Sequence, residues 1–163
     1  MSPVSYLQVV GSLICLVPPG YQLIRARSPS YISPQGLNSS LLLHLMDPSL
    51  YKTLTVDRGF TYNYYYSPAS DSRLTLLFLH GFPASSFDWH RQVSHFKAQG
   101  YGIIAPDLLG AGKTSHPEDY TQFNATRMAG DIINILNKEK VEKVVGVSHD
   151  WSVLWHSVNE DEF

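Results

Sequence analysis

The chain has 163 residues, of which 44% are hydrophobic and 16% are charged, and this composition fits a globular domain with a substantial core. Its formal net charge of −2 gives no basic surface of the kind that binds nucleic acid, so no nucleic-acid partner is expected. The single cysteine, Cys15, excludes an intrachain disulfide and a cysteine-rich metal site, and the seven histidines show no metal-ligand spacing. We therefore expect neither a bound metal nor a cofactor.

Residues 1–45 are rich in Ser, Pro and Gly and show no sustained periodicity, which predicts an irregular N-terminal extension with at most a short helix over 40–45. Residues 7–17 are apolar, but this stretch is too short for a stable membrane span. A signal peptide is the alternative, although no Lys or Arg precedes the stretch and no clear cleavage site follows it. These features slightly favour a cytoplasmic location and leave residues 46–163 as a partial folded domain.

The folded part begins with a predicted β-hairpin. Residues 51–56 and 60–66 alternate in character on either side of Asp57, Arg58 and Gly59, and the glycine suits the turn. The tyrosines of the second stretch are predicted to pack within a sheet rather than to form a binding surface.

Strands and helices alternate in the rest of the chain. Apolar runs and helical periodicity predict, in chain order, a strand over 74–79, a helix from 85–86 to Gly100, a strand over 102–105, a helix starting near Asn124 and a strand over 143–148. This alternation indicates an α/β fold with a parallel sheet and right-handed crossovers. Ligands of such sheets bind beyond the carboxyl ends of the strands.

The last strand runs into Ser148-His149-Asp150-Trp151-Ser152, in which small residues stand two positions before and after Asp150. This is the spacing of a nucleophile elbow, a sharp turn from strand to helix that requires small neighbours. A carboxylate that attacks an epoxide or alkyl-halide carbon forms an ester, which water can hydrolyse at the carbonyl group of the aspartate. The alternative interpretation is that Asp150 simply ends a strand.

Three segments together resemble the α/β-hydrolase family, and more narrowly its epoxide hydrolase branch. They are Leu79-His80-Gly81-Phe82-Pro83, Pro106-Asp107-Leu108-Leu109-Gly110 and Val147-Ser148-His149-Asp150-Trp151, which stand in the family's order and spacing. The resemblance runs from about residue 46 to about residue 151. It implies the N-terminal part of an α/β-hydrolase sheet, mostly parallel, incomplete and starting with an antiparallel hairpin. It also implies a small apolar partner, an epoxide or a related molecule.

The resemblance assigns roles to several residues. Asp150 would be the catalytic nucleophile, and the backbone N–H groups of Phe82 and Trp151 would form the oxyanion hole. Pro83 would stiffen the loop that presents Phe82, and His80 would anchor that loop without a catalytic role.

The chain departs from the family pattern in two ways. Ser148 and Ser152 stand where glycines are usual, and serine is small enough to preserve the elbow. The family's acidic residue, cap tyrosines and catalytic histidine have no counterpart in this sequence, and His156 is too near Asp150 along the chain to act as the base. We therefore expect a truncated chain that can form an ester but turns over slowly or not at all, so that a non-catalytic remnant is favoured over an active enzyme.

A truncation after the elbow has a structural consequence as well. With no later strand, residues 143–148 would form the edge of the sheet and leave one row of backbone N–H and C=O groups unpaired. Long apolar edges of this kind recruit other strands, so we expect a tendency to aggregate.

Two alternative functions remain. Gly110-Ala111-Gly112-Lys113-Thr114 resembles the end of a phosphate-binding P-loop, but Asp107 stands where that motif requires glycine and its carboxylate would repel phosphate. A haloalkane-type dehalogenase uses the same aspartate elbow. Such enzymes commonly hold Asn at the position of Phe82, and fluoroacetate dehalogenases hold Arg at that of Trp151, so this pair favours the epoxide hydrolase side.

Overall fold

The computed structural model describes residues 5–10, 46–70, 72–148 and 150. The predicted hairpin is present, with β2 (Tyr51–Thr55) pairing antiparallel to β3 (Thr61–Ser67). Gly59 adopts a φ of 83° in the turn, a conformation that glycine reaches at no steric cost. The tyrosines at 62, 64 and 65 are fully buried, which confirms that they pack in the sheet.

The hairpin forms one end of a mixed sheet with the strand order β1-β6-β4-β5-β3-β2. The end strands are β2 and β1 (Ser5–Val10), and β3 lies between them together with β4 (Thr75–Leu79), β5 (Gly102–Pro106) and β6 (Lys143–Ser148). Strand β3 pairs antiparallel to β5, whereas β4 pairs parallel to both β5 and β6. The predicted mostly parallel sheet that starts with an antiparallel hairpin is therefore confirmed.

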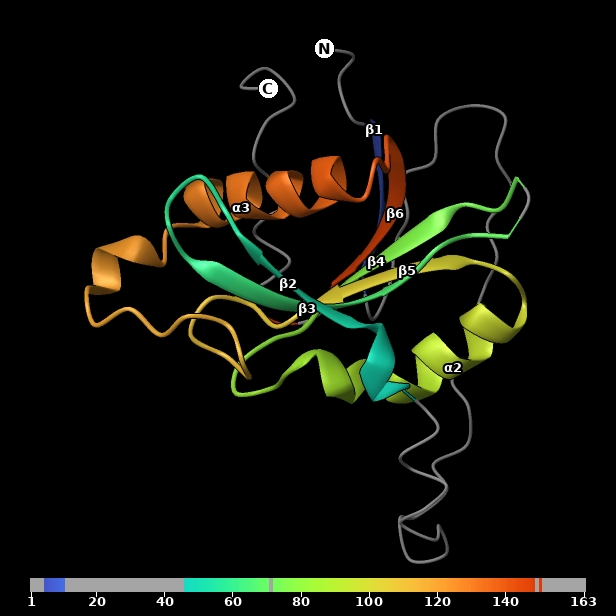
Figure 1. The fold of residues 1–163 in the computed structure, drawn as a ribbon, viewed down its shortest axis with the longest axis horizontal. Helices are drawn as coiled ribbons and strands as arrows, with labels where there is room; N and C mark the ends of the chain where they lie inside the picture. The colour runs from blue at the N-terminus through green and yellow to red at the C-terminus, as the bar shows by residue number, and fades with distance from the viewer. Residues whose placement is uncertain (1–4, 11–45, 71, 149, 151–163) are drawn as a thin grey trace, which may run out of the picture.

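Two α-helices cover opposite faces of this sheet (Figure 1). Helix α2 (His90–Ala98) continues from the 3-10 helix η3 (Ser86–Trp89), and α3 (Ala125–Lys138) follows η4 (Tyr120–Gln122). A further 3-10 helix, η2 (Pro48–Leu50), precedes β2. The α3 side of the core contains Leu77, Leu79, Ile104, Met128, Ile132, Ile135 and Leu136. The α2 side contains Tyr65, Leu76, Phe78, Val93, Ile103 and Ala105.

The helix boundaries follow from local chemistry. Asn124 caps α3, because its side-chain oxygen accepts the backbone N–H of Arg127 at 3.1 Å. Gly100, with a φ of 84°, ends the turn after α2. These boundaries match the sequence prediction, although the segment before α2 starts as a 3-10 helix.

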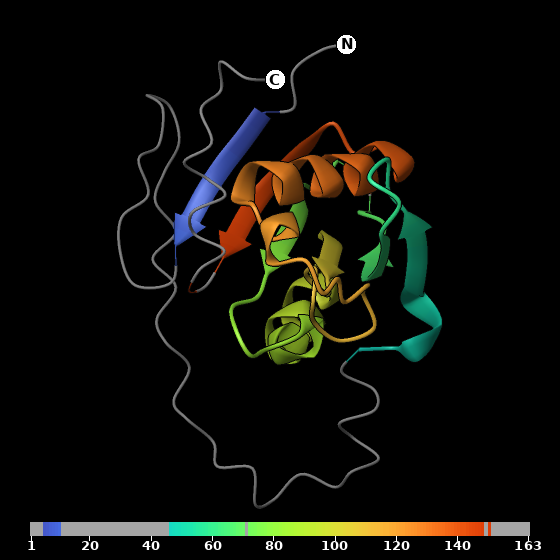
Figure 2. The ribbon, with the colours of Figure 1, turned by 90° about the vertical axis from the view of Figure 1, so that its left-hand side faces the viewer.

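The prediction of an open edge at residues 143–148 is wrong. Strand β1 (Ser5–Val10) lies parallel to β6, with a register that runs from Ser5 opposite Lys143 to Val10 opposite Ser148 (Figure 2). The expectation of an irregular extension is likewise wrong for these six residues. The sequence Ser-Tyr-Leu-Gln-Val-Val contains residues that favour strands, but it lacks the alternation of polar and apolar residues that would predict one. It forms a strand by pairing with the edge of β6, whose backbone groups would otherwise be unpaired on that side. The domain boundary near residue 46 remains a prediction, and the short helix expected over 40–45 lies outside the described residues.

No helix in the described part of the chain has the length and apolar character needed to cross a membrane.

Candidate active site

The candidate site lies at the carboxyl end of β6, where the chain leaves the buried strand. Asp150 is exposed and has a φ of 61°, in the left-handed region that residues with a side chain rarely occupy. Backbone conformations of this kind persist only where the surrounding structure holds them, and they gather at functional sites. The backbone of Asp150 is therefore compatible with a sharp turn at the end of β6, and the elbow itself remains a prediction.

The loop after β4 brings the second part of the site to Asp150. The backbone N–H of Phe82 donates to Asp150 Oδ2 at a distance of 3.1 Å. Gly81 permits this approach, since a Cβ atom there would collide with Asp150 Cβ and lie 2.8 Å from Oδ2. The next peptide bond, between Phe82 and Pro83, is cis. Two segments that lie 68 residues apart in the sequence thus meet at one carboxylate.

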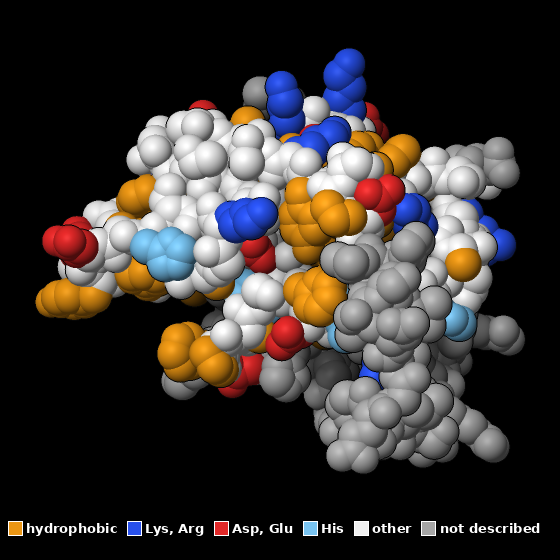
Figure 3. Space-filling view, turned by 60° about the horizontal axis from the view of Figure 1, so that its bottom comes forward, with side chains coloured by type: hydrophobic (Ala, Val, Ile, Leu, Met, Phe, Trp, Pro, Cys, Tyr) orange, Lys and Arg blue, Asp and Glu red, His pale blue; other side chains and the backbone are white. Residues whose placement is uncertain are grey.

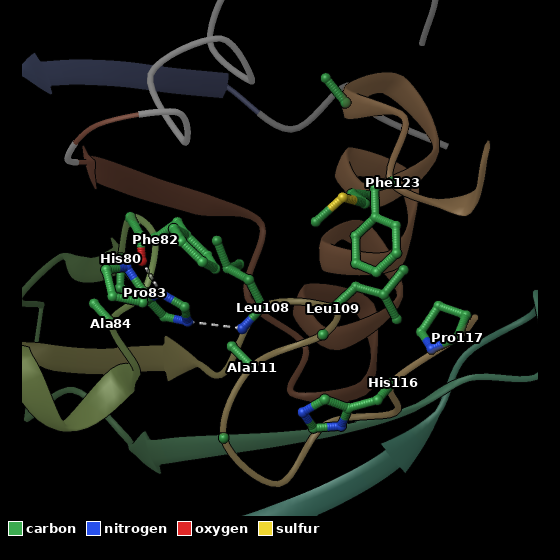
Figure 4. A pocket seen from close by; sticks show the side chains of 15 residues that line it. His80, Phe82, Pro83, Ala84, Leu108, Leu109, Ala111, His116, Pro117 and Phe123 are labelled. Carbon is green, nitrogen blue, oxygen red and sulfur yellow. Dashed lines mark hydrogen bonds between the residues drawn. The ribbon is translucent and has the colours of Figure 1, made fainter. Parts of the chain in front are cut away.

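His80 links this loop to the loop after β5. Its Nε2 atom accepts the backbone N–H of Leu108 at 2.9 Å, so Nε2 is unprotonated and the proton lies on Nδ1. Nδ1 then donates to the carbonyl oxygen of Gly81 at 2.8 Å (Figure 4). The ring is buried and both nitrogens are engaged, which agrees with an anchoring role and leaves no nitrogen for proton transfer.

Asp107, the residue after β5, fixes the other end of the Phe82 loop. Its Oδ1 accepts both the backbone N–H of Ser86, at 2.9 Å, and the hydroxyl group of Ser86, at 2.7 Å. Its Oδ2 accepts from Asn63 Nδ2 at 2.8 Å and from the backbone N–H of Lys113 at 3.1 Å. Burial raises the pKa of this carboxyl group, but the hydrogen bonds from Ser86, Lys113 and Asn63 outweigh burial, and the pKa is lowered overall.

The same contacts argue against a phosphate site in the glycine-rich loop. The Lys113 amide, which a P-loop would direct at phosphate, donates to the Asp107 carboxylate instead. A Cβ atom at Gly112 would collide with that carboxylate, so the loop is already packed around a negative charge.

Ser148, the last residue of β6, carries a buried hydroxyl group. The residue is fully buried, and its hydroxyl oxygen has no hydrogen-bond partner in the described structure. The serine at this position therefore leaves a buried polar group unsatisfied.

A pocket of about 790 Å³ opens beside the Phe82 loop. Its lining is mainly apolar and includes Phe82, Leu109, Pro117, Phe123 and Met128 (Figure 4). The side chain of Phe82 is 85% exposed, whereas its backbone N–H is bound to Asp150. The carboxylate is thus placed next to a pocket suited to an apolar molecule, although Asp150 itself is not among the lining residues.

One face of the molecule carries both hydrophobic and charged side chains. Figure 3 shows hydrophobic side chains in separate groups on one face, with scattered acidic and basic side chains between them. Among the described residues, no three His, Cys, Asp or Glu side chains gather in a way that could hold a metal ion.

Two of the three predicted site residues, Asp150 and Phe82, are in direct contact. Trp151 and His149 lie outside the described residues. Sequence reasoning missed the part played by Asp107 and Ser86. It treated Asp107 only as an obstacle to phosphate binding and Ser86 only as part of the start of a helix. A signal was present, since Asp107 directly follows a buried strand and precedes a glycine-rich loop whose amides need acceptors.

Comparison with known proteins confirms the predicted fold. Residues 75–151 match the α/β hydrolase fold family. An epoxide hydrolase from Caballeronia sordidicola is 41% identical over 76 residues, which are 47% of this chain and 23% of that protein. Epoxide hydrolase A from Mycobacterium tuberculosis is 32% identical over 84 residues, which are 50% of this chain and 26% of that protein.

Solved structures give the same result. The crystal structure of an epoxide hydrolase from Vigna radiata is similar with a TM-score of 0.59 and 30% sequence identity, covering 65% of this chain and 32% of that one. The chain spans about a quarter of the length of the curated relatives it matches.

Proposed function

We propose, from the premise that this chain carries part of an epoxide hydrolase-like α/β-hydrolase fold, that Asp150 is a nucleophile that opens an epoxide. The observation that carries the proposal is the contact between Asp150 Oδ2 and the backbone N–H of Phe82. An exposed carboxylate on a left-handed turn, with one oxygen held by a backbone donor, is arranged for attack through its other oxygen.

In the first step, Asp150 Oδ1 attacks one epoxide carbon. The carbon–oxygen bond of the ring breaks, its electron pair stays on the epoxide oxygen, and that alkoxide takes up a proton. The product is an ester in which Oδ2 has become the carbonyl oxygen.

In the second step, water loses a proton and attacks Cγ of Asp150. Negative charge then develops on Oδ2, where the Phe82 N–H already points, and a preorganised donor stabilises that charge most effectively. The backbone N–H of Trp151 would be the second donor. Collapse of the intermediate releases a diol and restores the carboxylate.

The pocket supports a small apolar substrate. An epoxide with an aryl or alkyl substituent could place that group against Phe123, Leu109 and Met128, which line the pocket beside the Phe82 loop. A charged substrate would lose hydration there without gaining an opposite charge from these side chains.

We expect the ester to be detectable, because its formation needs only the carboxylate of Asp150 whereas its cleavage also needs a base to deprotonate water. His80 uses both ring nitrogens in the loop network. His80 therefore does not supply that base.

The test is a time course of intact mass during incubation with styrene oxide. The chain should gain the mass of one whole epoxide, and Asp150→Asn should not. Asp88→Asn is the matched control, because Asp88 is an exposed carboxylate in the neighbouring η3 helix. An equal rate of labelling in Asp150→Asn, or no adduct in the unchanged chain, would refute the proposal. A parallel incubation with phenethyl chloride should release no chloride. Release of chloride would favour the dehalogenase alternative.

A further inference from the structure

The loop that carries Phe82 is held at both ends by consecutive residues that follow β5. At its start, His80 Nε2 accepts the backbone N–H of Leu108 at 2.9 Å. At its end, Asp107 Oδ1 accepts the two donors of Ser86 at 2.9 and 2.7 Å. Only residues 81–85 lie between these anchors, and Phe82 is one of them.

We propose that Asp107 is a positioning residue, which holds the 81–85 loop so that the Phe82 N–H stays on Asp150 Oδ2 while negative charge develops there. This inference rests on the proposed function of Asp150 as a nucleophile. Asp107 acts through the loop, by way of Ser86.

The carboxylate of Asp107 is itself immobilised, which is what this role requires. The residue is 4% exposed, and Asn63 and Lys113 hold the oxygen that Ser86 does not use. Its main chain is fixed as well, since its N–H donates to the Asn63 carbonyl at 2.9 Å and its carbonyl accepts from Thr114 Oγ1 at 2.6 Å. An acceptor that cannot rotate or shift gives a fixed position to whatever it binds.

The loop between the anchors has little slack. The backbone N–H of Ala84 donates to the carbonyl of Gly81 at 3.0 Å, and the same carbonyl accepts from His80 Nδ1 at 2.8 Å. A shift at Ser86 is therefore passed along a tight turn to Phe82, with no flexible segment to absorb it.

The role predicts a different effect on each chemical step. Ester formation depends mainly on the free oxygen of Asp150, whereas ester cleavage places charge on Oδ2 and needs the Phe82 donor. Displacement of a catalytic donor by about 1 Å can cost roughly 100-fold in rate. Loss of the Asp107 anchor should thus slow cleavage far more than formation.

The experiment measures both rates in the full chain, with Asp107→Asn and Ser86→Ala as test variants and Asp88→Asn as the control. Styrene oxide forms the ester, and neutral hydroxylamine then cleaves it. The hydroxylamine nitrogen adds to Cγ of Asp150, charge develops on Oδ2, and the alkoxide leaves and takes a proton, giving a hydroxamate and a diol. Asp107→Asn should slow cleavage at least about 10-fold and formation less than about threefold, while Asp88→Asn should change neither rate.

Cleavage at the unchanged rate in folded Asp107→Asn would overturn the proposal. If Asp107→Asn does not fold, Ser86→Ala decides, because it removes one of the two donors that Ser86 offers to Asp107 and keeps the other, the backbone N–H. Slower cleavage in that variant supports the proposal, and unchanged cleavage overturns it.

If the unchanged chain forms no ester, the proposed function fails and hydrogen exchange tests the positioning role alone. The Phe82 amide should then exchange at least about 10-fold faster in Ser86→Ala, while the amides of β5 exchange as before, because the opening is local. Equal exchange at Phe82 would overturn the positioning role, and faster exchange throughout β5 would show a global loss of stability instead.

Discussion

The close approach of Gly81 to Asp150 makes Gly81→Ala the most informative single change at this site. The backbone of Gly81 has no positive φ, so alanine is compatible with its conformation and the effect of the change is steric. The added Cβ would collide with Asp150 Cβ and lie 2.8 Å from Oδ2, against an ordinary contact distance of 3.4–4 Å. Asp150 must move by roughly 1 Å, and a misplacement of this size predicts a slowing of ester formation by about 100-fold.

The assay is the rate of adduct formation with styrene oxide, followed by intact mass, together with the free energy of unfolding. Gly130→Ala is the matched control, because a Cβ atom at Gly130 in α3 meets nothing within 4 Å. It should leave the rate unchanged and stabilise the chain by about 0.5–1 kcal/mol through better helix propensity. If Gly81→Ala reacts at the rate of the unchanged chain, the close contact between the loop and Asp150 does not exist as described.

Three further predictions concern stability. Arg58→Met removes the partly buried guanidinium group that donates to the buried Asp131 at 2.6 Å, and should destabilise the chain by about 3 kcal/mol at neutral pH because a buried carboxylate loses its partner. Burial raises the pKa of Asp131 in the folded state despite its hydrogen bonds to Tyr62 and Arg58, and loss of Arg58 raises this pKa further. The free-energy cost of Arg58→Met should therefore grow as pH rises through the folded-state pKa. It should shrink as pH falls toward about 3.9, the pKa of an unfolded-state aspartate. Urea unfolding at several pH values measures it, and an Arg58→Met cost independent of pH would contradict the reasoning. Ser148→Ala removes a buried hydroxyl without a partner and should stabilise the chain by about 1 kcal/mol in the same assay; destabilisation would indicate that the hydroxyl has a partner. Because the pKa of Asp107 is lowered in the folded state, its carboxylate contributes stability above about pH 4 that is lost as pH falls through the folded-state pKa, so the stability difference between the unchanged chain and Asp107→Asn should shrink in acid. A constant difference from pH 7 to pH 2 would show that the carboxylate charge plays no part.

Much of the fold could be predicted because local patterns and global packing agree. The apolar run at 74–79, the Asn124 cap and the buried face of α3 each favour the element that the structure contains. The pairing of β1 with β6 could not be predicted, because a six-residue stretch without alternation gives no sign of a distant partner. A strand that forms because it pairs with a sheet edge can be recognised only in the three-dimensional structure, where that edge is formed.

The candidate site, like the fold, could be predicted only in part from the sequence. The spacing around Asp150 and the His80-Gly81-Phe82-Pro83 segment identify two loops, and the parallel sheet brings them to one end. The network around Asp107 was not predictable, because its partners Asn63, Ser86 and Lys113 come from three separate parts of the chain. No spacing rule connects such residues, since only the packed loops bring them within hydrogen-bonding distance.

Peptide mapping of the styrene oxide adduct tests the central claim most directly, because it locates the covalent bond. We predict a single modified peptide that contains Asp150, with a mass increase equal to the whole epoxide and sensitivity to hydroxylamine, as expected of an ester. Modification at Asp88, at a histidine or at several sites, with the Asp150 peptide unchanged, would contradict the assignment of Asp150 as the nucleophile.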